Sequence, residues 1–170
     1  PWSNVLANGN FGTVVTESAG GYTWYKNSRE NKLTSWCNDP VSDVPSEAVY
    51  IKDDSTMQYI SPERIADGTG QYTVSYGLGY AVYRHSANKL SVAKTVFVPA
   101  SDSIKVSVLE IKNESDISKK LSVYYYADCN LSPAASAVPD NIALTVRKAS
   151  GIVYAENMNI PENGYMFAGC

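Results

Sequence analysis

The chain has 170 residues, of which 44% are hydrophobic and 18% are charged, and its 17 acidic and 14 basic residues leave a formal net charge of −3. A chain of this length can bury a hydrophobic core without disulfides or metals, and we interpret residues 1–170 as a single β-sandwich domain. No run of basic residues marks a surface for nucleic acid or anionic lipid. No apolar stretch approaches the roughly 18 residues of a membrane span, and Pro1–Ser3 does not resemble a signal peptide.

The cysteines and the histidine argue against a metal site. Cys37, Cys129 and Cys170 are odd in number and widely spaced, so they indicate neither a disulfide framework nor a CxxC metal motif. This pattern favours a reducing compartment. The single histidine, His85, leaves too few soft ligands for zinc, and we expect it at a strand end or in a turn. No metal and no cofactor are therefore expected.

The first informative segment in chain order is Gly20–Pro40, with the sequence GGYTWYKNSRENKLTSWCNDP. Side chains alternate along a strand, so Tyr22 and Trp24 share one face of an extended segment and Tyr25 lies on the other. Both faces therefore carry an aromatic ring. Such rings suit sugar contact, although aromatic pairs in sheets commonly only stabilise the sheet.

A polar cluster follows these aromatics. Asn27, Arg29 and Asn31 supply planar hydrogen-bond donors and Glu30 supplies an acceptor, which is the inventory that a hydroxyl-rich ligand requires. The ordinary alternative is a solvated turn after a strand. The residue types alone leave both interpretations open.

The rest of the chain predicts a succession of strands with little helix. The β-branched, partly alternating segments are Ala48–Lys52, Gly70–Tyr83, Val92–Val98, Ile104–Ile111, Leu121–Ala127, Ile142–Arg147 and Gly151–Glu156. The glycines of Tyr76–Tyr80 indicate a bulge or a close backbone approach, because no helix follows them and no Lys-Ser/Thr closes a phosphate loop. Ser61–Ala66 predicts at most a short helical turn, and Ser132–Asn141 predicts the longest loop. The pattern favours an antiparallel sandwich or barrel.

Segments along nearly the whole chain form a recognisable set: Pro1–Asn8, Asn10–Gly12, Gly20–Trp24, Asn27–Thr34, Asn38–Asp43, Tyr76–Tyr80, Ala93–Pro99 and Leu121–Tyr125. The set closely resembles the N-terminal β-supersandwich domain of glycoside hydrolase family 94, the family of cellobiose phosphorylase and cyclic β-1,2-glucan synthase. Asn27–Thr34 followed by Asn38–Val41 is nearer to the cyclic-glucan-synthase branch. Two segments depart from that branch: Ser35–Cys37 replaces Pro-Trp-Ser, and Val44–Glu47 replaces Pro-Pro-Gly-Glu.

The resemblance implies an all-β fold, an antiparallel supersandwich of the galactose mutarotase-like kind. We expect an incomplete copy, because both ends look cut from a longer enzyme. In that family an Asp of a separate (α/α)6 barrel is the catalytic acid, and inorganic phosphate is a co-substrate that attacks the anomeric carbon with inversion. The carboxylates of this chain are scattered and give no acid and base pair. We therefore expect the isolated chain to be inactive and to contain no catalytic residue.

The expected role is to bind or guide a β-glucan or oligosaccharide and to dock on the downstream barrel, with a homodimer as a further expectation. Six residues are the candidates for contact with sugar or with the barrel: Tyr22, Trp24, Asn27, Arg29, Asn31 and Asp39. Two alternatives stay open, an autonomous lectin-like carbohydrate-binding module and an immunoglobulin-like adhesion domain. The expected location is the cytoplasm, or the cytoplasmic portion of a membrane-anchored parent.

Overall fold

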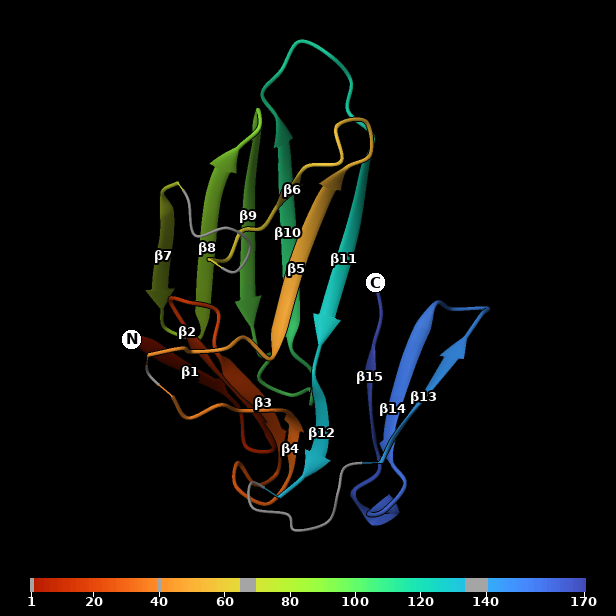
Figure 1. Cartoon of the computed structure of the whole chain (residues 1–170). Coiled ribbons are helices and arrows are strands. Elements are labelled where there is room, and N and C mark those ends of the chain that lie inside the picture. Colours follow the sequence, from red (N-terminus) through yellow and green to blue (C-terminus); the bar gives the residue numbers. More distant parts are fainter. Residues whose placement is uncertain (1, 40, 65–69, 134–140) are drawn as a thin grey trace.

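The computed structural model describes residues 2–39, 41–64, 70–133 and 141–170, and these residues fold into antiparallel sheets (Figure 1). Helical structure in the described residues is confined to a short 3-10 turn, Pro161–Asn163. No helix in this part of the chain is both long enough and apolar enough to span a membrane.

A five-stranded sheet forms the N-terminal part of the molecule, with the strand order β1-β2-β3-β4-β12. Its strands are β1 (Ser3–Ala7), β2 (Phe11–Thr16), β3 (Gly21–Tyr25), β4 (Lys32–Thr34) and β12 (Cys129–Ser132). The turn between β1 and β2 is made by Asn8, whose Oδ1 accepts the main-chain N–H groups of Asn10 and Phe11, both at 2.9 Å. Thus β12 joins a meander from a position almost 100 residues further along the chain.

A second sheet has four strands in the order β7-β8-β9-β10. Its strands are β7 (Tyr72–Gly77), β8 (Tyr80–Ala87), β9 (Leu90–Phe97) and β10 (Val106–Asn113). Residues of β9 alternate between buried and partly exposed along its whole length, as expected for a strand with one covered face.

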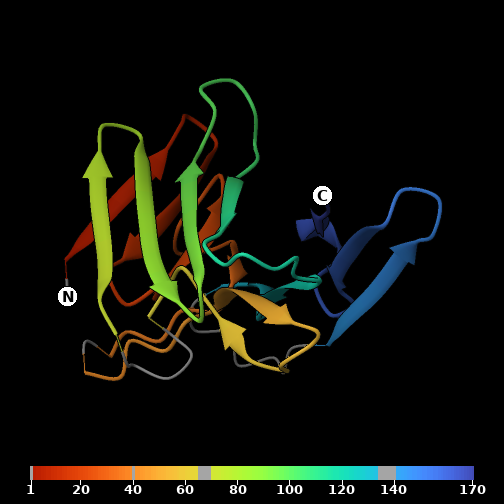
Figure 2. The same ribbon diagram turned by 90° about the horizontal axis from the view of Figure 1, so that it is seen from above.

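Two three-stranded sheets complete the fold. The first has the order β11-β5-β6 and is formed by β5 (Glu47–Asp53), β6 (Tyr59–Ile60) and β11 (Leu121–Ala127). The second is a meander of β13 (Ile142–Arg147), β14 (Ile152–Asn157) and β15 (Tyr165–Ala168). Figures 1 and 2 show this meander at the side of the molecule, beside β12.

The core lies on one face of β8 and β9 and has two parts. Where β1 and β2 cover this face, the buried residues are Leu6, Val15, Ala81, Tyr83 and Val96. Where β5 and β6 cover it, they are Ile51, Ile60, Leu90 and Val92. Lys94 lies on β9 between Val92 and Val96, so a charged side chain separates the two apolar clusters. Polar groups therefore accumulate where the covering sheets meet.

Most of the predicted strands are confirmed, and Leu121–Ala127 and Ile142–Arg147 match β11 and β13 residue for residue. The single strand predicted over Gly70–Tyr83 is wrong, because it is two strands joined by a turn in which Gly79 has a φ of 83°. A close approach is found at Gly77, where a Cβ atom would lie 2.3 Å from the ring of Tyr80.

Three further predictions need comment. His85 is not at a strand end: it lies within β8, buried, with its ring stacked on Tyr72 at 3.9 Å between centroids. Ser61–Arg64 form no helix, because the Ser61 hydroxyl accepts the N–H of Glu63 and makes a local turn; the remainder of that prediction falls outside the described residues. Most of the loop predicted over Ser132–Asn141 also falls outside the described residues, and Ser132 itself ends β12.

Candidate functional site

The aromatic residues predicted for sugar contact form a packed cluster with a third ring. The centroid of Tyr22 lies 5.4 Å from that of Trp24 and 4.9 Å from that of Trp36. The Lys32 ammonium lies 5.0 Å from the Tyr22 centroid, a distance at which a cation is attracted by the ring. We call these four residues, Tyr22, Trp24, Trp36 and Lys32, the Trp36 cluster.

Exposure differs sharply within the Trp36 cluster. Tyr22 is only 9% exposed, Trp24 is partly buried, and Trp36 is 44% exposed. Trp24 packs on Gly12 of β2, where a Cβ atom would lie 2.3 Å from the indole. Burial is also the main reason why the pKa of Lys32 is lowered. Tyr22 and Trp24 therefore form the base of the cluster, and Trp36, which was not among the predicted site residues, presents the accessible ring.

The predicted polar residues Asn27, Arg29 and Asn31 lie together in the loop between β3 and β4. The Asn27 Oδ1 accepts the main-chain N–H groups of Arg29 and Glu30 at 2.9 and 3.0 Å, so this side chain builds the turn. Arg29 is exposed and forms a surface ion pair with Glu30. The Oδ1 atom of Asn31 is buried and has no hydrogen-bond partner among the described residues.

Asp39 lies in the separate link between β4 and β5 and also builds a turn. Its carboxylate accepts the main-chain N–H of Val41 at 2.9 Å and the hydroxyl of Ser42 at 2.7 Å. These hydrogen bonds, that of Ser42 first, lower the pKa of Asp39. Among the described residues, the hydrogen bonds of the Asp39 side chain go to Val41 and Ser42, and none goes to the loop of Asn27. The structure therefore brings three of the four predicted polar residues into one loop.

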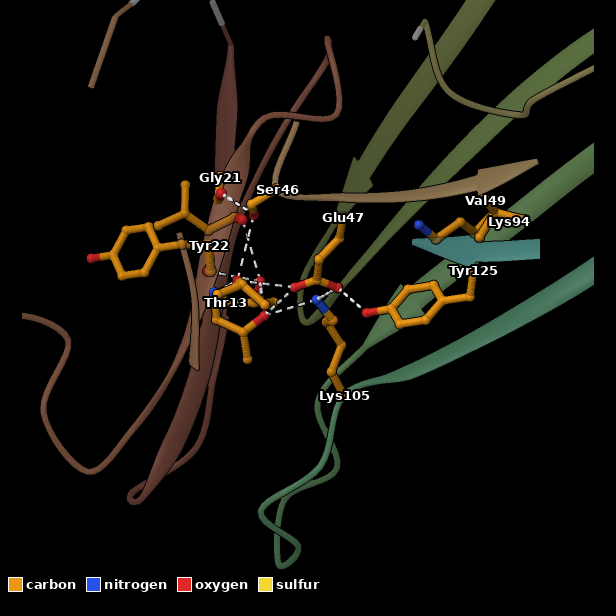
Figure 3. Close-up of polar contacts among 12 residues, drawn as sticks. Thr13, Gly21, Tyr22, Ser46, Glu47, Val49, Lys94, Lys105 and Tyr125 are labelled. Carbon is orange, nitrogen blue, oxygen red and sulfur yellow. Dashed lines mark hydrogen bonds and ion pairs between the residues drawn. The ribbon is translucent and has the colours of Figure 1, made fainter. Parts of the chain in front are cut away.

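A second polar cluster, not predicted from the sequence, surrounds Glu47 at the start of β5 (Figure 3). Its Oε1 accepts hydrogen bonds from the hydroxyls of Thr23 and Thr34 at 2.8 and 3.2 Å. Its Oε2 accepts the Tyr125 hydroxyl at 2.6 Å and pairs with the Lys105 ammonium. The ammonium also donates to the Thr23 hydroxyl at 2.8 Å. One carboxylate thus connects β3, β4, β5, β11 and the link between β9 and β10.

The surroundings of Glu47 hold it in the charged form. Burial on its own raises the pKa of this carboxyl, but the charge and hydrogen bond of Lys105, with the hydroxyls of Tyr125 and Thr23, outweigh burial and lower the pKa to about 2. Burial and the adjacent carboxylate raise the pKa of the Tyr125 phenol. Tyr125 therefore stays a neutral donor, and Glu47 stays an acceptor.

A second buried ion pair lies close to the first. Glu63 pairs with Lys94 of β9, and its Oε2 accepts the Val49 N–H at 3.2 Å. Both pairs line an internal hollow of about 30 Å³, which is the volume of a single water molecule. The hollow is too small for a sugar ring, and lysines already neutralise both of its carboxylates. No group of three or more His, Cys, Asp or Glu side chains able to hold a metal is found among the described residues.

Comparison with known proteins identifies the family to which this architecture belongs. Residues 1–162 match the glycosyl hydrolase 94 supersandwich domain. The chain belongs to this family. The family and the all-β antiparallel supersandwich expected from the resemblance are thereby confirmed, and the sheets described above are those of a supersandwich domain.

The relatives of this supersandwich domain are much longer proteins. It is 32% identical over 140 residues to N,N'-diacetylchitobiose phosphorylase from Vibrio furnissii, an alignment that covers 80% of this chain and 18% of the relative. It is 31% identical over 130 residues to the cyclic beta-(1,2)-glucan synthase NdvB from Rhizobium meliloti (strain 1021). This second alignment covers 75% of this chain and 5% of the relative. The chain thus spans less than a fifth of the length of either relative.

Proposed function

We propose that this supersandwich domain is a noncatalytic part of a glycoside phosphorylase or of an enzyme like cyclic β-1,2-glucan synthase, and that it contacts a β-glucan. The relatives that support this are a phosphorylase of a disaccharide and a synthase of a glucan. Bond cleavage, with inorganic phosphate as co-substrate, belongs in this proposal to a helical barrel of the same polypeptide. The supersandwich domain docks on that barrel, and a homodimer is the proposed assembly.

The observation that carries the proposal is the Trp36 cluster beside the loop of Asn27, Arg29 and Asn31. Trp36 offers a flat, half-exposed ring that packs on Tyr22, and Tyr22 in turn packs on Trp24. Aromatic faces bind the apolar C–H face of a pyranose, while nearby amide and guanidinium groups bind its hydroxyls. The exposed Arg29 and its partner Glu30 supply a donor and an acceptor close in sequence to the rings.

The state of the buried carboxylates supports a noncatalytic role. Hydrolysis of a glycoside needs one carboxyl group as acid and another as base or nucleophile, both facing the scissile bond. Glu47 and Glu63 face an interior hollow and are held by Lys105 and Lys94. They therefore act as structural ions, because neither has room for a substrate.

A fluorescence titration tests the sugar contact. The chain is titrated with β-1,2- and β-1,4-linked gluco-oligosaccharides and with N,N'-diacetylchitobiose while tryptophan emission is recorded. We expect a saturable change in at least one series, and a loss of affinity of about tenfold in Trp36→Ala, because one stacked ring contributes on the order of 1 kcal/mol or more.

Trp2→Ala is the matched control. Trp2 is 81% exposed and precedes β1, which lies at the opposite edge of the five-stranded sheet from β12 and β4. We expect this variant to bind like the unmodified chain. A Trp36→Ala variant that binds every sugar with unchanged affinity would remove the Trp36 cluster from the proposed contact surface. Release of a sugar phosphate by the chain alone would contradict the noncatalytic role.

A further inference from the structure

The meander β13–β15 has two faces of different chemistry. Residues directly opposite each other on antiparallel strands share a face, and Thr145 pairs with Tyr154, which pairs with Phe167. In the same way Glu156 pairs with Tyr165. We call the face formed by Thr145, Arg147, Tyr154, Glu156, Tyr165 and Phe167 the aromatic face.

The rings of the aromatic face pack against one another but remain accessible. Tyr154 meets Tyr165 edge to face, with 5.7 Å between centroids, and lies 6.4 Å from Phe167. The Arg147 guanidinium lies 5.2 Å from the Tyr154 centroid, where the cation is attracted to the ring. Tyr165 is 66% exposed. The strand register and these ring contacts hold the aromatic side chains in place while solvent still reaches them.

The aromatic face is also hollowed. Thr145, Arg147, Tyr154, Glu156 and Tyr165, together with a small residue, Ala143, line an open depression of about 230 Å³. This is below the about 300–1,000 Å³ of sites for drug-sized ligands, and it suits one sugar ring with its neighbours in solvent. Arg147 and Glu156 bring one positive and one negative charge, so the depression has no net charge to attract an ion.

The opposite face of the meander lacks this combination. It carries aliphatic residues, among them Leu144 and Val146, which are 65% and 57% exposed. A mainly aliphatic face, on which the buried Asn157 is already hydrogen-bonded to the chain, is suited to packing against protein. Aromatic rings mixed with a guanidinium, a carboxylate and hydroxyls are instead suited to a neutral ligand that is apolar on one side and rich in hydroxyls at its rim.

We propose that the aromatic face of β13–β15 is a second carbohydrate-binding site, which takes one unit of a neutral β-linked glucan. Tyr165 and Tyr154 provide the stacking surface. Arg147 donates to sugar hydroxyls and Glu156 accepts from them. The proposal rests on the proposed contact of this domain with β-glucan and adds a site that is separate from the Trp36 cluster.

The test is a titration of the ¹⁵N-labelled chain with β-1,2- and β-1,4-linked glucotetraose, followed by the NMR shifts of backbone amides. We expect saturable shifts on β13–β15. We expect Tyr165→Ala to weaken the binding measured from these shifts by about tenfold, through the loss of one stacked ring. Leu144→Ala is the control, because Leu144 is as exposed as Tyr165 but lies on the opposite face, and it should bind normally.

The outcomes separate this site from the proposed function. Sugar binding that is weakened by Trp36→Ala, with no shifts on β13–β15, would overturn the second site and leave the proposed function standing. Absence of any binding would overturn both. Equal weakening by Leu144→Ala and Tyr165→Ala, or β13–β15 shifts that follow protein concentration without sugar, would assign the meander to protein packing and overturn the site.

Discussion

Replacement of Glu47 by glutamine should destabilise the fold strongly. Glutamine keeps the size of the side chain and an oxygen that can accept hydrogen bonds, but it removes the negative charge opposite Lys105. The Lys105 side chain is only 15% exposed, so its ammonium would be left nearly buried without a counter-ion. Because Glu47 also connects two sheets and the link between β9 and β10, the loss should affect global unfolding and not only one loop.

The magnitude follows from the pKa of Glu47. A fall from 4.5 to about 2 corresponds to about 3 kcal/mol, at about 1.4 kcal/mol for each tenfold change in the acid constant. Removal of one partner of a buried ion pair typically costs about 3–5 kcal/mol, which agrees with this value. A domain with a typical stability of about 5–15 kcal/mol would lose a large share of it.

Urea unfolding at pH 7 measures this loss, with the midpoint and the m value both recorded. Glu30→Gln is the matched control, because Glu30 forms an exposed pair with Arg29 and should change stability by less than about 1 kcal/mol. The double variant Glu47→Gln, Lys105→Met removes both charges and should recover part of the loss. A single Glu47→Gln variant within about 1 kcal/mol of the unmodified chain would refute the structural role of this ion pair.

Four further results are expected from the same unfolding assay. The lowered pKa of Glu47 is a stabilising contribution that is complete above about pH 4.5 and is lost as the pH falls toward about 2; constant stability over that range would contradict it. Gly21→Ala should cost more than about 1 kcal/mol, because Gly21 has a φ of 115° and a Cβ atom would lie 2.1 Å from the main-chain oxygen of Val14; a neutral result would mean that the backbone relaxes there. Tyr125→Phe should cost about 1.5–3 kcal/mol through its hydrogen bond to a charged group, and no loss would show that water replaces the hydroxyl. Asn8→Ala should cost about 2 kcal/mol, because its amide donates to two carbonyls of the link between β9 and β10, each at 2.8 Å; an unchanged midpoint would exclude that tether.

The strands were predictable where burial follows a period of two. Buried residues alternate along β9, and three of the four, Leu90, Val92 and Val96, are apolar, so the pattern is visible in the sequence even though Lys94 shares their face. The short strands β4, β6 and β12 have between two and four residues, too few for a periodic signal. The position of β12 also depends on a long-range contact, because β12 joins β4 across almost 100 residues.

The candidate site was predictable only in part. Tyr22 and Trp24 were identified by residue type, but burial against Gly12 and the exposure of Trp36 depend on how β2, β3 and the segment after β4 pack. The Glu47 cluster was missed because its partners, among them Thr23 and Lys105, are far apart in sequence. Each of them alone resembles an ordinary polar residue of a strand or a link.

The most direct test of the proposed function is calorimetric titration of the chain with β-1,2- and β-1,4-linked glucotetraose in phosphate buffer, with sugar phosphate assayed in the same samples. A domain that contacts glucan without catalysis should give a saturable heat of binding with at least one of the two oligosaccharides and no sugar phosphate. Absence of binding to both, or formation of sugar phosphate by the chain alone, would contradict the proposed function.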